Sequence, residues 1–90
     1  MRKARRAALV AADLSAMNLS YALLSGADLA GVSLSGANLS DTEFVSAGLT
    51  RANLEGAYLS RTDLSGANLS GVTMSGAVLT SAQMDSVVRY

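Results

Sequence analysis

The first candidates for acid–base or metal chemistry in this sequence are the carboxylates, because the 90 residues contain no His and no Cys. Two of them, Glu43 and Asp63, stand twenty residues apart, and paired carboxylates can transfer a proton or hold a cation. Without His or Cys the chain cannot assemble a Ser-His-Asp triad, a Cys-His pair or a Cys/His zinc site. We therefore expect no catalytic residue, no metal ligand and no cofactor, and we expect that the protein is not an enzyme.

The residues that must position these carboxylates follow a repeat with a period of five. Every fifth residue from Leu9 to Met84 is large and apolar, and thirteen of these sixteen central residues are Leu. The residue two places earlier is Ala in eleven of the sixteen units, and the residue just before the central one is often Asp or Asn. Ser usually follows the central residue, and Gly occupies the next position seven times.

A period of five fits neither an α-helix nor a flat strand, because both would spread the central residues over different faces. A chain that turns a corner every five residues instead directs the Ala and the Leu of each unit inward. Ser and Gly after the Leu suit the corner. Four units then make a square coil of twenty residues, and stacked coils lie about 4.8 Å apart, the ordinary spacing between strands.

The recurring pattern A(D/N)LSG, as in Ala67-Asn68-Leu69-Ser70-Gly71, resembles the pentapeptide-repeat family. The resemblance covers residues 7–86 without an insertion. It implies an all-β fold, a right-handed quadrilateral β-helix of about four coils. Residues 1–6 are then expected to form a basic N-terminal tail or cap, and residues 87–90 a C-terminal cap or tail.

In such a coil, residues twenty positions apart stack in one column, and the columns indicate candidate contact residues. Asp41 and Arg61 become neighbours, and we expect an exposed ion pair there. Glu43 and Asp63 become like-charged neighbours on an open face, which favours neither catalysis nor a strong cation site. The candidate residues for contact with a partner are Tyr21, Leu23, Tyr58, Val78, Asp41, Glu43, Arg61 and Asp63. Simple capping is the favoured role of Val87, Val88 and Tyr90, and an end-to-end contact with another copy is the alternative.

The net charge of zero hides an asymmetry. Within residues 7–86 there are seven carboxylates and two arginines, whereas residues 1–6 carry four basic side chains. An acidic coil is similar to relatives that mimic DNA and protect type II topoisomerases such as gyrase. Those relatives are longer, more acidic and dimerise through a C-terminal helix for which this chain has too few residues after Met84.

These observations favour a structural or protein-interaction module that presents flat faces to a protein partner or to other copies. A small acidic DNA mimic that binds a type II topoisomerase is the alternative. Nucleic acid is not an expected partner, since the four basic residues of the tail have no aromatic residues between them. The longest apolar run, from Ala7 to Ala12, is too short to span a membrane, and we expect a cytoplasmic protein.

Overall fold

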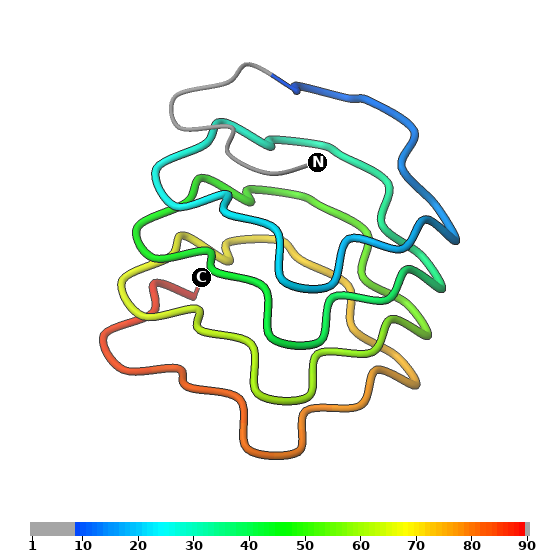
Figure 1. Ribbon diagram of the computed structural model, residues 1–90. Helices are drawn as coiled ribbons and strands as arrows, with labels where there is room; N and C mark the ends of the chain where they lie inside the picture. Colours follow the sequence, from blue (N-terminus) through cyan, green and yellow to red (C-terminus); the bar gives the residue numbers. More distant parts are fainter. Residues whose placement is uncertain (1–8, 90) are drawn as a thin grey trace.

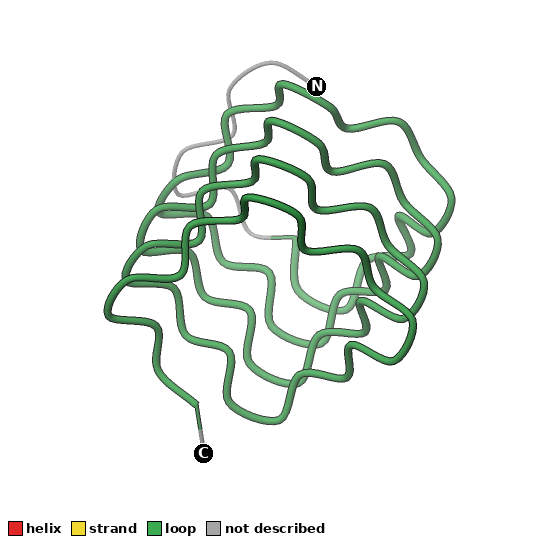
Figure 2. Ribbon diagram, turned by 90° about the horizontal axis from the view of Figure 1, so that it is seen from below, coloured by secondary structure: helices red, strands yellow, loops and turns green. Residues whose placement is uncertain are grey.

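The computed structural model describes residues 9–89, and the chain in this range turns a corner every five residues. Four such corners bring the chain back beside its starting point, one coil further along the stack, so the coils stack in register (Figures 1 and 2). The first coil and the last coil lie at opposite ends of the stack (Figure 1). The expected square coil of twenty residues is therefore confirmed.

Each corner is a four-residue turn that begins at a central apolar residue. The carbonyl oxygen of Leu24, for example, accepts the N–H of Ala27 at 3.1 Å, and the second residue inside this turn, Gly26, has a φ of +74°. A hydrogen-bonded turn with a positive φ at this position alone is a type II turn, which prefers Gly there. The repeat places Gly at seven of the sixteen corners for this reason, and the other nine corners hold residues with side chains, including Asp41 and Arg61.

Successive coils are joined by parallel backbone hydrogen bonds. The Leu34 N–H donates to the carbonyl of Asn53 at 2.7 Å, and the Asn53 N–H donates to the carbonyl of Val32 at 2.9 Å. All twelve β-bridges among the described residues are parallel and join positions twenty apart. Residues 9–89 contain no helix and no continuous strand, because each side of the square offers one bridging residue before the chain turns again. The sheets of this all-β fold are therefore ladders of single residues.

The Ala and Leu columns fill the interior. Central residues from Leu19 to Leu64 have at most 2% of their surface exposed, and the Ala residues between them are equally buried. Thr42 and Thr62 take the inward place of an Ala, and both are completely buried. Their hydroxyls donate to the carbonyl oxygens of Leu19 and Leu39 at 2.8 and 2.6 Å. A buried hydroxyl is tolerated when it has such a partner.

Where Asp or Asn precedes a central residue, its side chain has a structural task. Asn68 Oδ1 accepts the N–H of Ser70 at 3.0 Å, and Asp63 Oδ1 accepts both the N–H and the hydroxyl of Ser65 at 3.0 and 2.6 Å. Asp and Asn are favoured in turns because their side chains bond the backbone two residues later. The same contact is made by Asp13, Asn18, Asp28, Asn38 and Asn53. The preference for Asp and Asn at this position is thus explained by capping of the following turn.

Candidate functional site

One corner of the coil carries a stacked ion pair. Arg61 lies one coil beyond Asp41 and donates two hydrogen bonds to its carboxylate, from Nε at 3.0 Å and from Nη2 at 2.8 Å. These bonds lower the pKa of Asp41 and raise that of Arg61. The Arg61 side chain is 61% exposed and that of Asp41 22%, so solvent screens the pair. The ion pair expected from the twenty-residue spacing is confirmed, and Tyr21, 72% exposed, is the preceding member of this corner column.

The face that follows this corner along the chain carries an acidic column. β-Bridges join Leu23 to Glu43, Glu43 to Asp63 and Asp63 to Gln83. Asp63 Oδ1 is engaged by Ser65, as described above, whereas Glu43 is exposed. Within residues 9–89 no group of three His, Cys, Asp or Glu side chains is placed to hold a metal ion. The column therefore provides negative charge on an open surface and forms no enclosed acid–base site.

The face before the same corner carries an aromatic side chain beside an aliphatic one. Tyr58 and Val78 are joined by a β-bridge, and their exposed fractions are 52% and 38%. The far edge of this face is a corner column that holds Gly36, Gly56 and Gly76, and Glu55 is exposed at the same corner as Gly56. Tyr58 is thus the most exposed large apolar side chain of this face.

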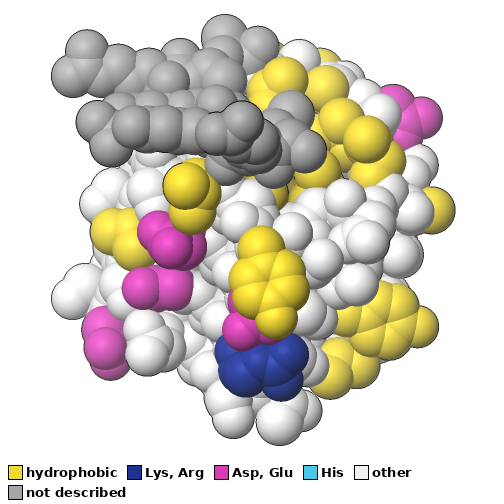
Figure 3. Space-filling model, in the orientation of Figure 1, with side chains coloured by type: hydrophobic (Ala, Val, Ile, Leu, Met, Phe, Trp, Pro, Cys, Tyr) yellow, Lys and Arg dark blue, Asp and Glu magenta, His cyan; other side chains and the backbone are white. Residues whose placement is uncertain are grey.

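The structure brings the eight candidate contact residues onto one continuous surface. Within a coil, the Tyr58 face leads into the corner at Arg61, and the corner leads into the Asp63 face. We call these two faces and the corner between them the Tyr58–Asp63 surface. Figure 3 presents one side of the molecule, where hydrophobic, acidic and basic side chains are interleaved. Among residues 9–89, seven carboxylates outnumber three arginines, which gives the described part of the chain a net charge of −4.

A hollow of about 400 Å³ lies at the last coil of the described residues, lined by Leu69, Gly71, Val72, Met74, Leu79 and Arg89. Leu79, a central residue of the last coil, is 37% exposed. Val87 packs against the core and Val88 forms a β-bridge with Asn68, whereas Tyr90 lies outside the described residues. Val87 and Val88 therefore follow the coil path, and both their favoured role as a cap and the alternative of a contact with another copy stay predictions.

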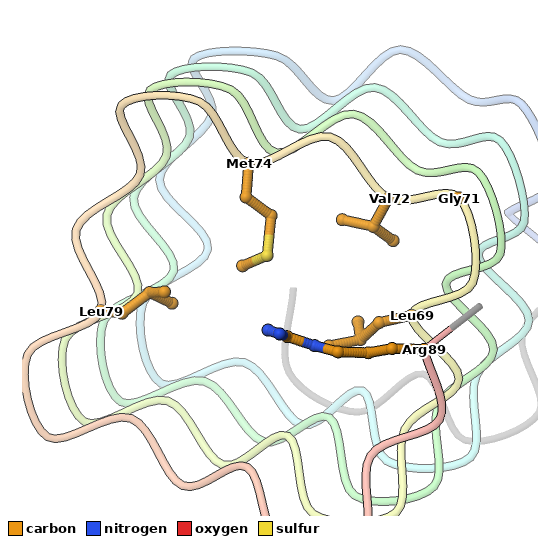
Figure 4. A pocket seen from close by; sticks show the side chains of 6 residues that line it. All are labelled: Leu69, Gly71, Val72, Met74, Leu79 and Arg89. Carbon is orange, nitrogen blue, oxygen red and sulfur yellow. The ribbon is translucent and has the colours of Figure 1, made fainter.

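Arg89 is a residue of this last coil that the sequence interpretation missed. Counting five residues on from Met84 reaches Arg89, so it occupies the position of a central Leu. Its side chain extends over Leu69 toward the middle of the coil (Figure 4). The five-residue period continues without a break to position 89 and marks it as an inward position. This was overlooked because Arg is not apolar.

Comparison with known proteins agrees with this architecture. The family model for pentapeptide repeats matches residues 7–44 and 47–85 in eight copies. A pentapeptide repeat protein (Rfr23) from the cyanobacterium Cyanothece 51142 is 33% identical, with a TM-score of 0.86 over 96% of this chain and 63% of that one. A search of curated proteins gave no significant match.

Two further solved structures are more distant. A pentapeptide repeat protein from the Arabidopsis thaliana thylakoid lumen is 27% identical, with a TM-score of 0.53 over 83% of this chain and 59% of that one. A pentapeptide repeat protein (alr5209) from Nostoc PCC 7120 is 26% identical, with a TM-score of 0.58 over 99% of this chain and 85% of that one. This chain thus spans less than two thirds of the Cyanothece and Arabidopsis proteins.

The described residues include no helix that is long and apolar enough to cross a membrane. The stack of four-sided coils is a right-handed quadrilateral β-helix. The match of the family model over most of the sequence, the relative at 33% identity and the five-residue period together identify the family. The chain belongs to the pentapeptide repeat family.

Proposed function

We propose that this chain is a non-enzymatic module that binds a partner protein through the Tyr58–Asp63 surface. The observation that carries the proposal is the exposed pair of Tyr58 and Val78 on a flat face. Tyr is among the residues that contribute most to protein–protein binding, because its ring buries a large area and keeps a polar tip. Backbone hydrogen bonds to the coils on either side fix the main chain from which this ring projects.

The charges beside this pair specify the chemistry of the partner. Glu43 is exposed on the adjoining face, and Asp63 lies directly beyond it in the same column. A complementary protein surface therefore has an apolar patch that receives Tyr58 and Val78, and a rim of Lys or Arg that faces the acidic column. Rim charges of this kind act mainly on the rate of association and on its dependence on salt.

The proposal is tested by crosslinked pull-down from host extract, read by mass spectrometry, followed by titration with the purified partner. Tyr58→Ala is expected to weaken binding at least tenfold, which corresponds to about 1.4 kcal/mol. Glu43→Gln is expected to slow association and reduce its salt dependence. The matched control is Val10→Ala, since Val10 is 54% exposed on a corner that does not border the Tyr58–Asp63 surface.

The control variant should bind the partner as the unaltered chain does. The proposal fails if the partner binds Tyr58→Ala and Glu43→Gln with unchanged affinity and unchanged salt dependence. It also fails if Val10→Ala weakens binding as much as Tyr58→Ala, because the contact would then lie elsewhere on the coil.

A second candidate is DNA mimicry directed at a type II topoisomerase. The observation in its favour is the excess of carboxylates among residues 9–89, with Glu43 and Asp63 stacked in one column. The expected result is inhibition of supercoiling by gyrase that is lost in a Glu43→Gln/Asp63→Asn double variant. Supercoiling that proceeds unchanged with the chain in excess would reject this candidate and leave the first one standing.

A further inference from the structure

We infer that Arg61 binds a carboxylate of the partner protein, an inference that rests on the function proposed above and adds one contact to it. Arg61 stands at the corner between the Tyr58 face and the Asp63 face, and its side chain is 61% exposed. Among residues 9–89 it is the only basic residue of the Tyr58–Asp63 surface. Figure 3 presents a side of the molecule on which basic, acidic and hydrophobic side chains lie next to one another.

Asp41 holds the Arg61 guanidinium in one orientation. Nε and Nη2 donate to Oδ1 and Oδ2 of Asp41 at 3.0 and 2.8 Å, so these two bonds occupy one edge of the planar group. Among residues 9–89, no acceptor contacts the other edge, which is formed by Nη1 and the second N–H of Nη2. This edge carries two parallel N–H groups, the arrangement with which arginine binds both oxygens of one carboxylate.

A guanidinium held in this way is suited to binding. A long exposed side chain must be ordered when it enters an interface, and the lost rotamer freedom opposes association. The two bonds to Asp41 already restrict Arg61 before a partner arrives. Arg51, by contrast, forms no ion pair within residues 9–89. Arg61 therefore offers its remaining edge at a smaller entropic cost than Arg51 would.

The surrounding charges favour a single protein carboxylate as the occupant over a polyanion. Glu43 and Asp63 stand in one column on the adjoining face, and residues 9–89 carry a net charge of −4. A polyanion such as nucleic acid would bring further phosphates against these carboxylates. An Asp or Glu side chain that is flanked by the Lys or Arg rim of the partner meets opposite charge at each of these places. The occupant is therefore an Asp or Glu side chain next to that rim.

Asp41 also determines which rate constant the contact affects. The carboxylate of Asp41 offsets the charge of Arg61 at a distance, so the pair adds little to the long-range attraction of a partner. The hydrogen bonds of the free edge act only when the two proteins touch, and loss of such bonds mainly speeds dissociation. Arg61 thus differs from Glu43, whose unpaired charge is expected to act on association.

The test measures both rate constants by surface plasmon resonance, with the protein recovered by the crosslinked pull-down of the unaltered chain as the probe. The double variant Asp41→Asn/Arg61→Gln keeps the net charge of the chain, because it removes one charge of each sign. We expect it to dissociate from the partner about tenfold faster and to associate at an unchanged rate. An Asp→Asn and Glu→Gln scan of the partner should find one carboxylate whose loss speeds dissociation from the unaltered chain but has no further effect in the double variant.

Arg51→Gln is the matched control. Arg51 is also an exposed arginine, lies at the diagonally opposite corner of the coil, and has a φ of +60° against +59° for Arg61. It should dissociate from the partner as the unaltered chain does. Circular dichroism establishes that each variant folds. Should the double variant fail to fold, Asp41→Ser/Arg61→Ser replaces it, since Ser81 occupies the same corner column with a φ of +61°.

Dissociation of the double variant at the rate of the unaltered chain overturns the inference, and so does equally fast dissociation of Arg51→Gln. Faster dissociation without a coupled carboxylate on the partner overturns it as well. Tyr58→Ala judges the proposed function separately: weaker binding of Tyr58→Ala with an unchanged double variant rejects this inference alone. A partner that binds Tyr58→Ala and Glu43→Gln as it binds the unaltered chain rejects both, as does a pull-down that recovers no partner.

Discussion

The hydroxyl of Thr62 donates a 2.6 Å hydrogen bond to the carbonyl oxygen of Leu39, a residue of the preceding coil, inside an otherwise apolar core. Thr42 makes the same contact with Leu19, so the same type of hydrogen bond occurs in two successive coils. The hydroxyl joins neighbouring coils through the interior, in addition to the backbone ladders on the outside. At these two inward positions a hydrogen bond connects neighbouring coils through the core. An Ala at the same position would make only van der Waals contacts.

Replacing Thr62 by Val tests the energetic value of this bond. Val has the same shape but no hydroxyl, and the Leu39 carbonyl keeps its turn bond from the Thr42 N–H at 3.1 Å. We expect a loss of about 1 kcal/mol in the free energy of unfolding, the usual net value of one hydrogen bond. Thr62→Ser, which keeps the hydroxyl, should retain the bond and lose only the methyl packing. Denaturant unfolding that finds the Val variant as stable as the unaltered chain would contradict a stabilising role.

Leu54 and Leu79 provide a matched comparison of core depth. Both are central residues, but Leu54 is completely buried and Leu79 is 37% exposed. Leu54→Ala is expected to cost about 2–5 kcal/mol, because it leaves a cavity between two coils. Leu79→Ala should cost clearly less, since one side of Leu79 already faces solvent. Leu54→Asp should abolish cooperative unfolding in a thermal melt, and a stably folded Leu54→Asp protein would disprove the inward register.

The corners predict opposite effects for two substitutions at equivalent positions. Gly36 has a φ of +68° and open space where a Cβ would lie, so Gly36→Ala is limited by backbone strain alone. We expect it to cost about 1 kcal/mol. Ser46 has a φ of +59°, and Ser46→Gly relieves the same strain, with an expected gain of about 0.5 kcal/mol after the entropy of Gly in the unfolded chain is subtracted. Equal signs for the two changes in chemical denaturation would rule out corner strain as the cause.

The Asp41–Arg61 pair predicts a dependence of stability on pH. Hydrogen bonds from Arg61 lower the pKa of Asp41 in the folded chain. The pair therefore contributes fully above the unfolded pKa of about 3.9, and this contribution is lost as the pH falls through the lower, folded pKa. The difference in melting temperature between the unaltered chain and Asp41→Asn should be constant from about pH 7 to pH 5 and decrease below about pH 4.

Arg61→Gln is the control for this pH experiment. Arg61→Gln removes the partner of Asp41, so the difference in melting temperature between this variant and the unaltered chain should shrink over the same acidic range. Because the pair is exposed, added salt should reduce both differences near neutral pH. A difference between Asp41→Asn and the unaltered chain that persists undiminished at about pH 2 would show that the carboxylate charge is not its cause.

The five-residue period by itself determined the coil, the inward columns and the neighbours across coils. The Asp41–Arg61 ion pair and the Tyr58–Val78 bridge follow from a separation of twenty residues alone. This works because a square coil converts a sequence distance directly into a spatial one. The capping hydrogen bond of Asn68 could also be predicted from the sequence, since it joins residues only two positions apart.

Other features were decided by the tertiary structure. The positive φ of Asp41 and Arg61 follows from the stack, because corners that must lie in register impose one backbone conformation even on residues that disfavour it. The acceptor of the Thr62 hydroxyl lies twenty-three residues away on the preceding coil, a relation that no local pattern expresses. The direction of the Arg89 side chain across the hollow is likewise set by the coil, because residue type alone would place an arginine on the outside.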